Sequence, residues 1–405
     1  MLDKVNVTEP VIPAAEFRVS GTEKNAVQLV LNACADAGGG RVIVPAGVHP
    51  CGALTLSGNT ELHLEAGAIL DFSSDPKDYL PVVFTRWEGI ECYNFHPLIY
   101  ARDCENIAVT GSGVLRGNGQ PWWHWKDLQH AAAKKLYDAE ADGVPPGKRV
   151  FGTERDGLRP QFIQFVNCRN VLIEGVRVEN GPQWTIHPVY CENVIVRGVT
   201  IDTTGPNTDG LNPDSCRDVL IEDCDFATGD DCIAINSGMN EDGWRVGRPC
   251  ENVLIRNCRM TRGHGGIVIG SGMSGGVRNI TAHDCAIDGT ELGIRLKAMR
   301  GRGGVVENVD VRDMRVDNIL GEVIQITTFY SATTIKPKSE VPPVFRDIRM
   351  ENITGSGGIG IQLLGLPEEK LRHIVLRHVS IAADDAMQCA DVAELTLEDI
   401  NVTRR

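Results

Sequence analysis

The sequence predicts an all-β protein, a right-handed parallel β-helix in which one chain winds through repeated coils. Short runs of alternating apolar residues, such as Val219-Leu220-Ile221, indicate strands because alternation has the period of a strand. These runs follow a recurring phrase of Asn or Asp and then Val or Ile, spaced 23 to 39 residues apart from Asn170 onward. Such a period is typical of solenoids. The 44 glycines suit many turns, and an aromatic content of 5% suits a core of stacked aliphatic residues.

The recurring phrase defines the coils. It begins at Asn106, Asn170, Asn193, Asp218, Asn252, Asn279, Asn308 and Asp347. Residues 1–50 precede these coils and are expected to form an N-terminal cap with the first coil. Ala26 to Ala37 have helical spacing that Gly38-Gly39-Gly40 ends, and a helix there would cover the unpaired strands at the end of the solenoid. Residues 51–405 then form the β-helix domain.

Three excursions interrupt the coils, near residues 84–101, 119–160 and 330–343. The second contains Trp122, Trp123 and Trp125, and a helix is expected from Lys126 to about Ala141. Long loops on a solenoid usually form its binding face. The tryptophans could stack on sugar rings or could pin the excursion to the solenoid, and we favour the second reading.

The thirteen cysteines fall mostly at two fixed places in the repeat. One set precedes the phrase by two residues and the other follows it by six; the sets are Cys104, Cys168, Cys191, Cys216 and Cys250, and Cys224, Cys258 and Cys285. This placement predicts two ladders of buried thiols. Disulfides between adjacent coils are geometrically possible, but an odd cysteine count argues against a disulfide scaffold. The spacings match no zinc motif, so we expect no metal and no cofactor.

The net charge is 40 − 54 = −14, which disfavours nucleic acid as a partner. No run of eighteen apolar residues suggests a membrane span. The first residues lack the pattern of a secretion signal, so a cytoplasmic location is expected, with a secreted or periplasmic protein that has lost its leader as the alternative. The sequence makes no prediction of oligomeric state. Local cations could still hold an acidic ligand on this acidic body: His264, Arg295, Lys297, Arg300 and Arg302.

Four polar motifs occur within about ninety residues, each on its own repeat. They are Asn207-Thr208-Asp209-Gly210, Gly229-Asp230-Asp231, Gly263-His264-Gly265 and Arg295-Leu296-Lys297. Asp230 and His264 both lie 12 residues after their phrase, and Asp209 and Arg295 both lie 16 residues after theirs. Aspartates after glycine are often only turn formers. Matching offsets on coils about 4.8 Å apart predict instead one polar face.

This face has the groups that glycosidic bond cleavage requires, namely an acid, a base and cations for a charged sugar. Neighbouring carboxylates should raise the proton affinity of Asp230. Asn207 is expected to order its loop or touch substrate. Gln183 and His187, which lie 13 and 17 residues after Asn170, are further candidates for substrate contacts.

The four motifs, in this order, resemble those of the polygalacturonases, glycoside hydrolase family 28, and in particular bacterial exo-acting members. The resemblance implies hydrolysis of α-1,4 bonds in polygalacturonate or oligogalacturonides with inversion at the anomeric carbon. It implies that Asp230 is the general acid, and that Asp209 and Asp231 hold and deprotonate water. His264 would hydrogen-bond the acid, and Arg295 and Lys297 would bind the galacturonate carboxylate.

Several alternatives remain open. Within the same reaction, endo action competes with exo action, and branched or rhamnose-containing pectin is a second substrate class. A pectate lyase is disfavoured, because it would need calcium ligands and an arginine base. A β-helical adhesin that only binds carbohydrate is the non-enzymatic alternative, although such a protein would not need aligned acids and cations.

Overall fold

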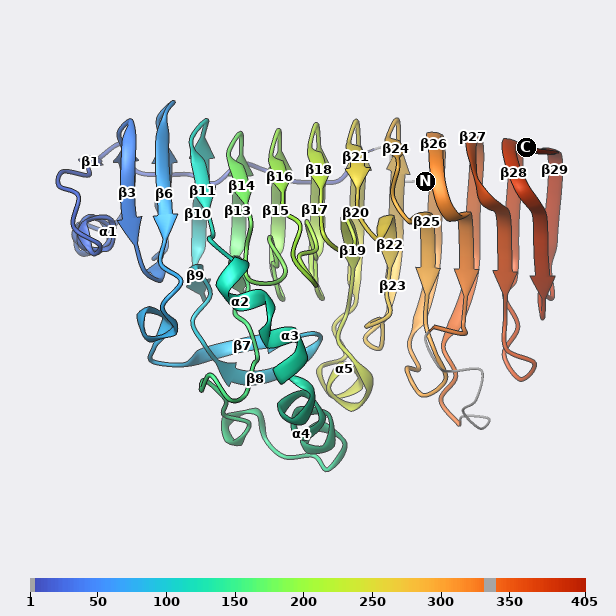
Figure 1. Ribbon diagram of the computed structural model, residues 1–405, viewed down its shortest axis with the longest axis horizontal. Coiled ribbons are helices and arrows are strands. Elements are labelled where there is room, and N and C mark those ends of the chain that lie inside the picture. Colours follow the sequence, from blue (N-terminus) through green and yellow to red (C-terminus); the bar gives the residue numbers. More distant parts are fainter. Residues whose placement is uncertain (1–3, 331–339) are drawn as a thin grey trace.

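The computed structural model describes residues 4–330 and 340–405 and confirms the predicted parallel β-helix (Figure 1). Most of the predicted third excursion, residues 331–339, lies outside the described residues. Successive coils stack through three ladders of parallel strands. Inward-facing aliphatic residues of each coil, such as Val219 and Ile221, are completely buried.

The first ladder starts directly after the recurring phrase begins. Its strands are β1 (Glu16–Arg18), β2 (Gly40–Val44), β5 (Thr60–Leu64), β10 (Glu105–Gly111), β13 (Arg169–Glu174), β15 (Glu192–Arg197), β17 (Arg217–Glu222), β20 (Cys250–Arg256), β23 (Val277–His283), β26 (Val305–Thr327), β27 (Val344–Leu364), β28 (Arg372–Ala390) and β29 (Leu395–Arg404). The last coils run through several ladders without a break, which is why β26 to β28 are so long.

The second ladder follows a turn in each coil. It contains β3 (Gly47–Cys51), β6 (Ala68–Phe72), β11 (Val114–Arg116), β14 (Arg177–Glu179), β16 (Thr200–Asp202), β18 (Asp225–Ala227), β21 (Arg259–Arg262) and β24 (Ala286–Asp288), and then joins β26.

The third ladder carries the polar motifs. It contains β4 (Leu54–Thr55), β9 (Ile99–Arg102), β12 (Ile163–Val166), β19 (Ile233–Ile235), β22 (Gly265–Ile269) and β25 (Leu292–Lys297). Between β12 and β19, two coils take part only through single bridges at Ile186 and Leu211.

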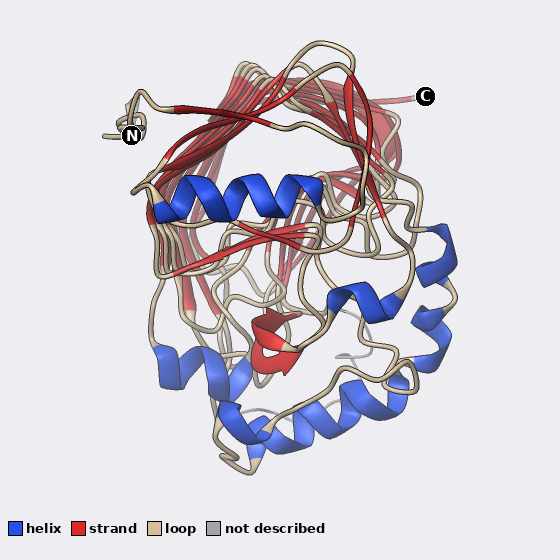
Figure 2. Ribbon diagram, turned by 90° about the vertical axis from the view of Figure 1, so that its left-hand side faces the viewer, coloured by secondary structure: helices blue, strands red, loops and turns tan. Residues whose placement is uncertain are grey.

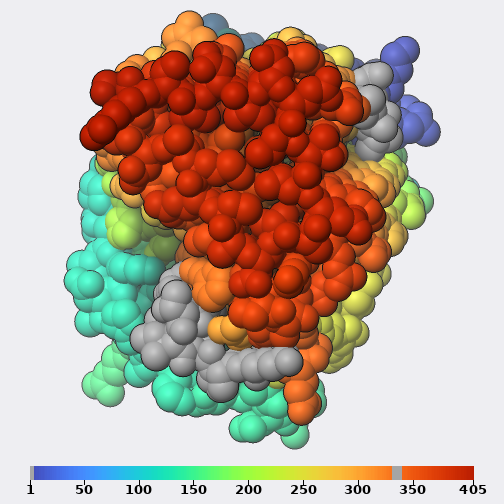
Figure 3. Space-filling view, turned by 90° about the vertical axis from the view of Figure 1, so that its right-hand side faces the viewer, coloured from blue at the N-terminus to red at the C-terminus, as the bar shows by residue number. Residues whose placement is uncertain are grey.

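Helix α1 (Ala26–Asp36) lies across the N-terminal end of the solenoid, as predicted (Figure 2). Its buried face includes Val27, Leu31 and Cys34. The opposite end is formed by the C-terminal coils, and no helix of the described chain covers it (Figure 3).

The excursions gather on one side of the solenoid (Figure 1). The first is an antiparallel hairpin of β7 (Val83–Trp87) and β8 (Ile90–Asn94). The second contains three helices where one was expected, because the helical run is broken at His124 and Gln129. The remaining helices are α2 (Gln120–Trp123), α3 (Trp125–Leu128), α4 (His130–Ala141), α5 (Asn240–Val246) and the short 3₁₀ turns η1 (Pro76–Tyr79) and η2 (Pro146–Lys148). None of the helices described is long and apolar enough to cross a membrane.

The asparagine of the recurring phrase has a specific structural task. Asn170 and Asn193 adopt φ values of 56° and 58°, a left-handed conformation that asparagine tolerates better than most residues. The amide of Asn193 donates to Asn170 (2.7 Å), and that of Asn170 donates to Asn106 (2.9 Å). The same bond recurs from Asn279 to Asn252 (3.0 Å). The phrase therefore forms a hydrogen-bonded asparagine ladder along the solenoid.

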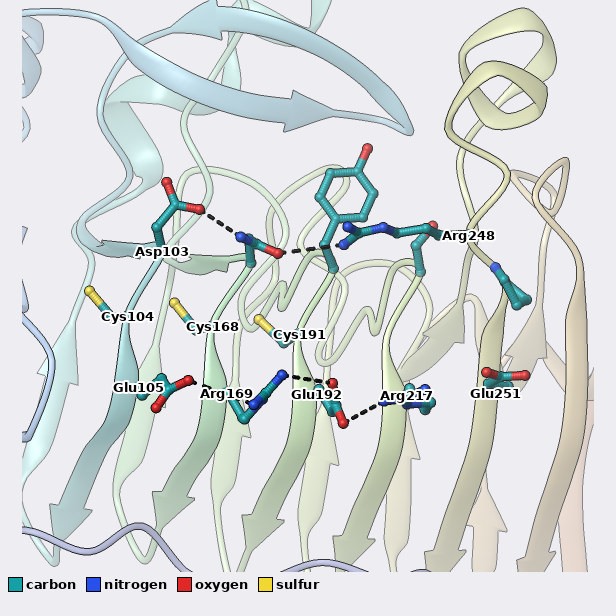
Figure 4. Close-up of a pocket in the computed structure, with 14 residues that line it drawn as sticks. Asp103, Cys104, Glu105, Cys168, Arg169, Cys191, Glu192, Arg217, Arg248 and Glu251 are labelled. Carbon is teal, nitrogen blue, oxygen red and sulfur yellow. Dashed lines mark hydrogen bonds and ion pairs between the residues drawn. The ribbon is translucent and has the colours of Figure 1, made fainter.

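The two cysteine ladders are also present. Cys104, Cys168 and Cys191 lie in a row on successive coils (Figure 4), and all thirteen cysteines are free thiols. Twelve are buried or half-buried, and Cys389 is exposed. These thiols thus act mainly as small core residues, as the repeat predicted.

Candidate active site

The three aspartates come together at the start of the third ladder. Gly210 N–H donates to Asp231 O (2.9 Å), and His264 N–H donates to Asp230 O (2.9 Å), so the motifs stack coil on coil. One carboxylate oxygen from each of Asp209, Asp230 and Asp231 lies within 4.8 Å of the other two. Gly265 is required beside them, because a Cβ there would meet Asp231 Oδ1 at 2.7 Å.

Asp209 and Asp231 each have a dedicated partner. Asn212 donates to Asp209 Oδ2 (2.9 Å). The ammonium of Lys297 donates to Asp231 Oδ2 (2.8 Å), and both of these side chains are buried. The predicted cation Lys297 is therefore brought to the carboxylates themselves. The three aspartates are also close enough to ligate a divalent cation, but Lys297 already supplies a positive charge at this place.

Asp230 is held at the turn by two donors. The amide of Asn207 donates to Asp230 Oδ2 (3.2 Å), and the backbone N–H of Asp231 donates to Oδ1 (3.0 Å). Asn207 is fixed in turn by the buried guanidinium of Arg159 (2.8 Å), a residue that sequence reasoning missed. Of the two predicted roles for Asn207, the structure shows that it orders this loop.

The electrostatics of the cluster favour retention of a proton. Burial raises the pKa of Asp209 well above its usual range, and the carboxylates of Asp230 and Asp231 raise it further. Burial, followed by the charge of Asp231, also raises the pKa of Asp230. Burial lowers the pKa of Lys297, but the Asp231 carboxylate outweighs this effect, and the net shift is upward. The site therefore combines a permanent cation with carboxyls that resist ionisation.

His264 does not make the predicted hydrogen bond to the carboxyl of Asp230. Its Nδ1 lies 2.6 Å from Glu291 Oε2, and Arg295 Nη1 lies 3.0 Å from its Nε2. Because a guanidinium can only donate, Nε2 accepts and Nδ1 carries the proton toward Glu291. His264 thus positions Arg295, whose Nε is also fixed by Gln325 (2.7 Å).

Gln183 and His187 are turned inward. Both have no exposed surface. Gln183 donates to Glu88 Oε1 (3.1 Å), and His187 lies between Gln164 (2.9 Å) and Asp214 (3.4 Å). The structure does not bring either side chain to the surface of the cavity, so the predicted direct substrate contacts are replaced by supporting ones.

A cavity of about 180 Å³ opens beside the three aspartates. Both excursions contribute to its wall: Glu88 and Gly89 come from the turn of the β7–β8 hairpin, and Tyr137 comes from α4. Sequence reasoning missed the further wall residues, which are Trp184, Asn236, Met239, Arg302 and Tyr330. Their only signal in the sequence was the length of the excursions.

The tryptophans of the second excursion pack as core residues. Trp122 and Trp125 are buried, and their rings lie 4.8 Å apart. Trp122 also contacts Tyr79 and Phe95 edge to face. The favoured reading, in which they pin the excursion to the solenoid, is confirmed for this pair.

A larger cavity of about 480 Å³ lies elsewhere, beside the cysteine ladder (Figure 4). Its floor is a row of alternating charges in which Arg169 lies between Glu105 (3.7 Å) and Glu192 (3.6 Å). Arg217 also pairs with Glu192. Because these charges neutralise one another, this cavity lacks the crowded carboxyls that mark the smaller one.

Comparisons with known proteins agree with this geometry. Residues 151–398 match the profile described as glycosyl hydrolases family 28. The crystal structure of a hyperthermoactive exopolygalacturonase from Thermotoga maritima is 39% identical with a TM-score of 0.94, over 98% of this chain and 94% of that one.

Two curated sequences are similar at lower identity. An endo-polygalacturonase of Pectobacterium carotovorum subsp. carotovorum is 26% identical over 96% of this chain and 92% of its own length. A probable polygalacturonase of Vitis vinifera is 29% identical over 85% of this chain and 67% of its own length. The chain spans only 42% to 66% of three further plant relatives. Together with the aligned carboxylates, these matches show that the chain belongs to glycosyl hydrolases family 28.

Proposed function

We propose that the protein hydrolyses α-1,4 bonds of polygalacturonate and oligogalacturonides, and that it removes one galacturonate at a time from the non-reducing end. The observation that carries this proposal is the cluster of three buried carboxylates around one small cavity with Lys297 at its edge. The similar exopolygalacturonase from Thermotoga maritima supports the substrate class and the exo action.

The roles follow from the chemistry of the cluster. Asp230 keeps its proton through burial and the neighbouring charge, and donates it to the oxygen of the leaving sugar. Asp209 and Asp231 hold a water and take its proton as the water attacks the anomeric carbon. The sugar that is attacked must therefore lie in the cavity that these two residues line.

The leaving sugar lies on the opposite side of Asp230. His264 follows Asp230 by one coil, and Arg295 follows on the next coil. Arg295 is suited to bind a carboxylate there because its guanidinium is held in place by His264 and Gln325.

Exo action follows from the closed cavity. Its volume of about 180 Å³ is below the roughly 300–1,000 Å³ of pockets for larger ligands. Glu88, Gly89 and Tyr137 leave room for one sugar beyond the scissile bond, so only a chain end fits. Endo action is the second candidate, because a similar protein of comparable length is an endo-polygalacturonase.

A time course on polygalacturonate tests both parts of the proposal. Galacturonate should be the only short product from the first minute. A ladder of oligomers at low conversion would favour endo action, and the absence of any reducing sugar would contradict the substrate class. As a control for a protein that only binds, Asp230→Asn should keep binding to the polymer but lose turnover.

A further inference from the structure

One cation of the cavity wall has no counter-charge. The cavity is lined by two cationic side chains, Lys297 and Arg302. Lys297 is paired with Asp231, as described above. Arg302, which is half-buried, forms no ion pair with any residue in the described ranges 4–330 and 340–405. Its Nη1 donates to the neutral amide oxygen of Asn240 (2.6 Å), and its buried Nε has no hydrogen-bond partner in this part of the chain.

This arrangement is expensive in the free protein. Taking a cation out of water costs free energy unless an anion or several hydrogen bonds replace the water. Burial accordingly lowers the pKa of Arg302. A counter-anion that arrives with the substrate would repay this cost.

Arg302 is nevertheless held firmly in place by two helices. The amide of Asn240, at the start of α5, donates to Glu140 Oε1 (3.0 Å), and Glu140 is a buried residue of α4. The backbone carbonyl of Arg302 accepts from Trp244 Nε1 (2.9 Å). Burial raises the pKa of Glu140 to about 7, so this chain of contacts is itself costly to maintain. Such a network is built to aim Arg302 rather than to neutralise it.

The position of Arg302 identifies the group that it faces. It shares the cavity with Asp209 and Asp231, whereas Arg295 and His264 do not line this cavity. Tyr137 of α4 lines the same wall, and its hydroxyl makes no hydrogen bond to the described residues. A guanidinium beside a phenol hydroxyl is suited to a carboxylate.

We propose that Arg302, with Tyr137 as a second donor, binds the carboxylate of the sugar that the enzyme releases. This inference rests on the proposed function, because it places that sugar in the cavity lined by Asp209 and Asp231. The enzyme then reads a uronate on each side of the scissile bond, through Arg302 on the closed side and Arg295 on the open side. Asn240 and Glu140 are positioning residues for Arg302.

The test uses two disaccharides with the same leaving galacturonate and the same α-1,4 bond. One carries galacturonate at the non-reducing end, and the other carries galactose, which lacks the carboxylate. Wild type should prefer the first in kcat/KM by about 10- to 100-fold, the range expected for hydrogen bonds to a charged group. Arg302→Gln should lose this factor on the acidic disaccharide, while kcat/KM on the neutral one changes by less than about threefold.

Arg300→Gln is the matched control. Arg300 lies on the same turn but pairs with Glu368 (2.7 Å), so the variant should discriminate as wild type does. Asn240→Ala keeps the guanidinium but frees it, and should lose part of the discrimination. It also keeps the inference testable if Arg302→Gln does not fold.

The outcomes separate the two proposals. If wild type does not cleave the acidic disaccharide, the proposed function fails. If wild type cleaves it but Arg302→Gln lowers kcat/KM equally on both substrates, or on neither, only the role of Arg302 is overturned. A discrimination lost in Arg295→Gln but kept in Arg302→Gln would likewise overturn the assignment.

Discussion

Replacing Asp209 by asparagine should stabilise the fold while it removes most of the activity. The asparagine is nearly isosteric, and its carbonyl oxygen can still accept from Asn212. Its amide group then faces the two other aspartates as a donor. The substitution thus removes one of three crowded negative charges without leaving the Asn212 amide unpaired.

The size of the effect follows from the distances. Two unit charges 4.8 Å apart repel each other by about 3.5 kcal/mol at an effective dielectric constant of about 20. Wild type escapes part of this repulsion by retaining a proton. We therefore expect Asp209→Asn to raise the free energy of unfolding by about 1–3 kcal/mol at pH 8, less than the full Coulomb energy. The rate should fall by about 10²–10⁴-fold, as for loss of a general base.

The dependence on pH fixes the sign. The pKa of Asp209 is raised in the folded state, whereas in the unfolded chain it is about 3.9. The unfolded chain therefore loses this proton first, and stability falls as the pH rises from about 4 through the folded pKa. The advantage of Asp209→Asn should be near zero below about pH 4 and should grow toward neutral pH.

Asp214→Asn is the matched control. Asp214 is equally buried, and burial alone would raise its pKa, but Arg86 and His187 outweigh burial and lower it. A lowered pKa gives stability that is present above about pH 4 and lost as the pH falls. Asp214→Asn should therefore cost about 3–5 kcal/mol at pH 8. Urea unfolding of both variants at pH 4, 6 and 8 measures this. If Asp209→Asn destabilised the protein at pH 8 as Asp214→Asn does, the argument from crowded carboxylates would be refuted.

Four further outcomes are expected. Lys297→Met should lower the free energy of unfolding by about 3–5 kcal/mol at pH 7, because it leaves Asp231 buried without its cation, and a loss below about 1 kcal/mol would contradict the pairing. Asp230→Asn should reduce kcat by about 10²–10⁴-fold with an unchanged circular dichroism spectrum, and activity within tenfold of wild type would remove it from the acid's role. Proton NMR of the first product should show the β-anomer if the reaction inverts, whereas an α-anomer would indicate retention, which the close spacing of the carboxylates would normally favour. Trp122→Ala should cost about 3–5 kcal/mol by urea unfolding because its ring is buried against Trp125, and a near-neutral result would mean that the ring is not part of the core.

The fold could be predicted because each coil repeats the same local rules. An asparagine suited to a left-handed turn and alternating aliphatic residues recur in every repeat, so the pattern is audible in the sequence without any distant contact. The central carboxylates were predictable for the same reason. Asp209, Asp230 and Asp231 sit at fixed offsets from the phrase, and stacked coils convert equal offsets into neighbours.

The wall of the cavity could not be predicted in this way. Glu88 and Tyr137 lie in excursions that have no fixed register with the coils, and their approach to Asp230 depends on how the loops pack. The inward turn of His187 was missed for a different reason. An offset gives the coil and the approximate face, but successive side chains of an extended segment alternate between core and surface.

The asparagine ladder also gives the molecule a direction. In each bond the later coil is the donor and the earlier coil is the acceptor, as from Asn193 to Asn170 and from Asn279 to Asn252. During synthesis the acceptor is therefore already in place when the next coil leaves the ribosome, and each coil can lock onto a finished template. Asp218 interrupts the run, because a carboxylate accepts from Asn252 (2.9 Å) but cannot donate backward to Asn193. The interruption falls on the coil that delivers Asp230 and Asp231, so the ladder is broken where the catalytic turn is made and begins anew behind it.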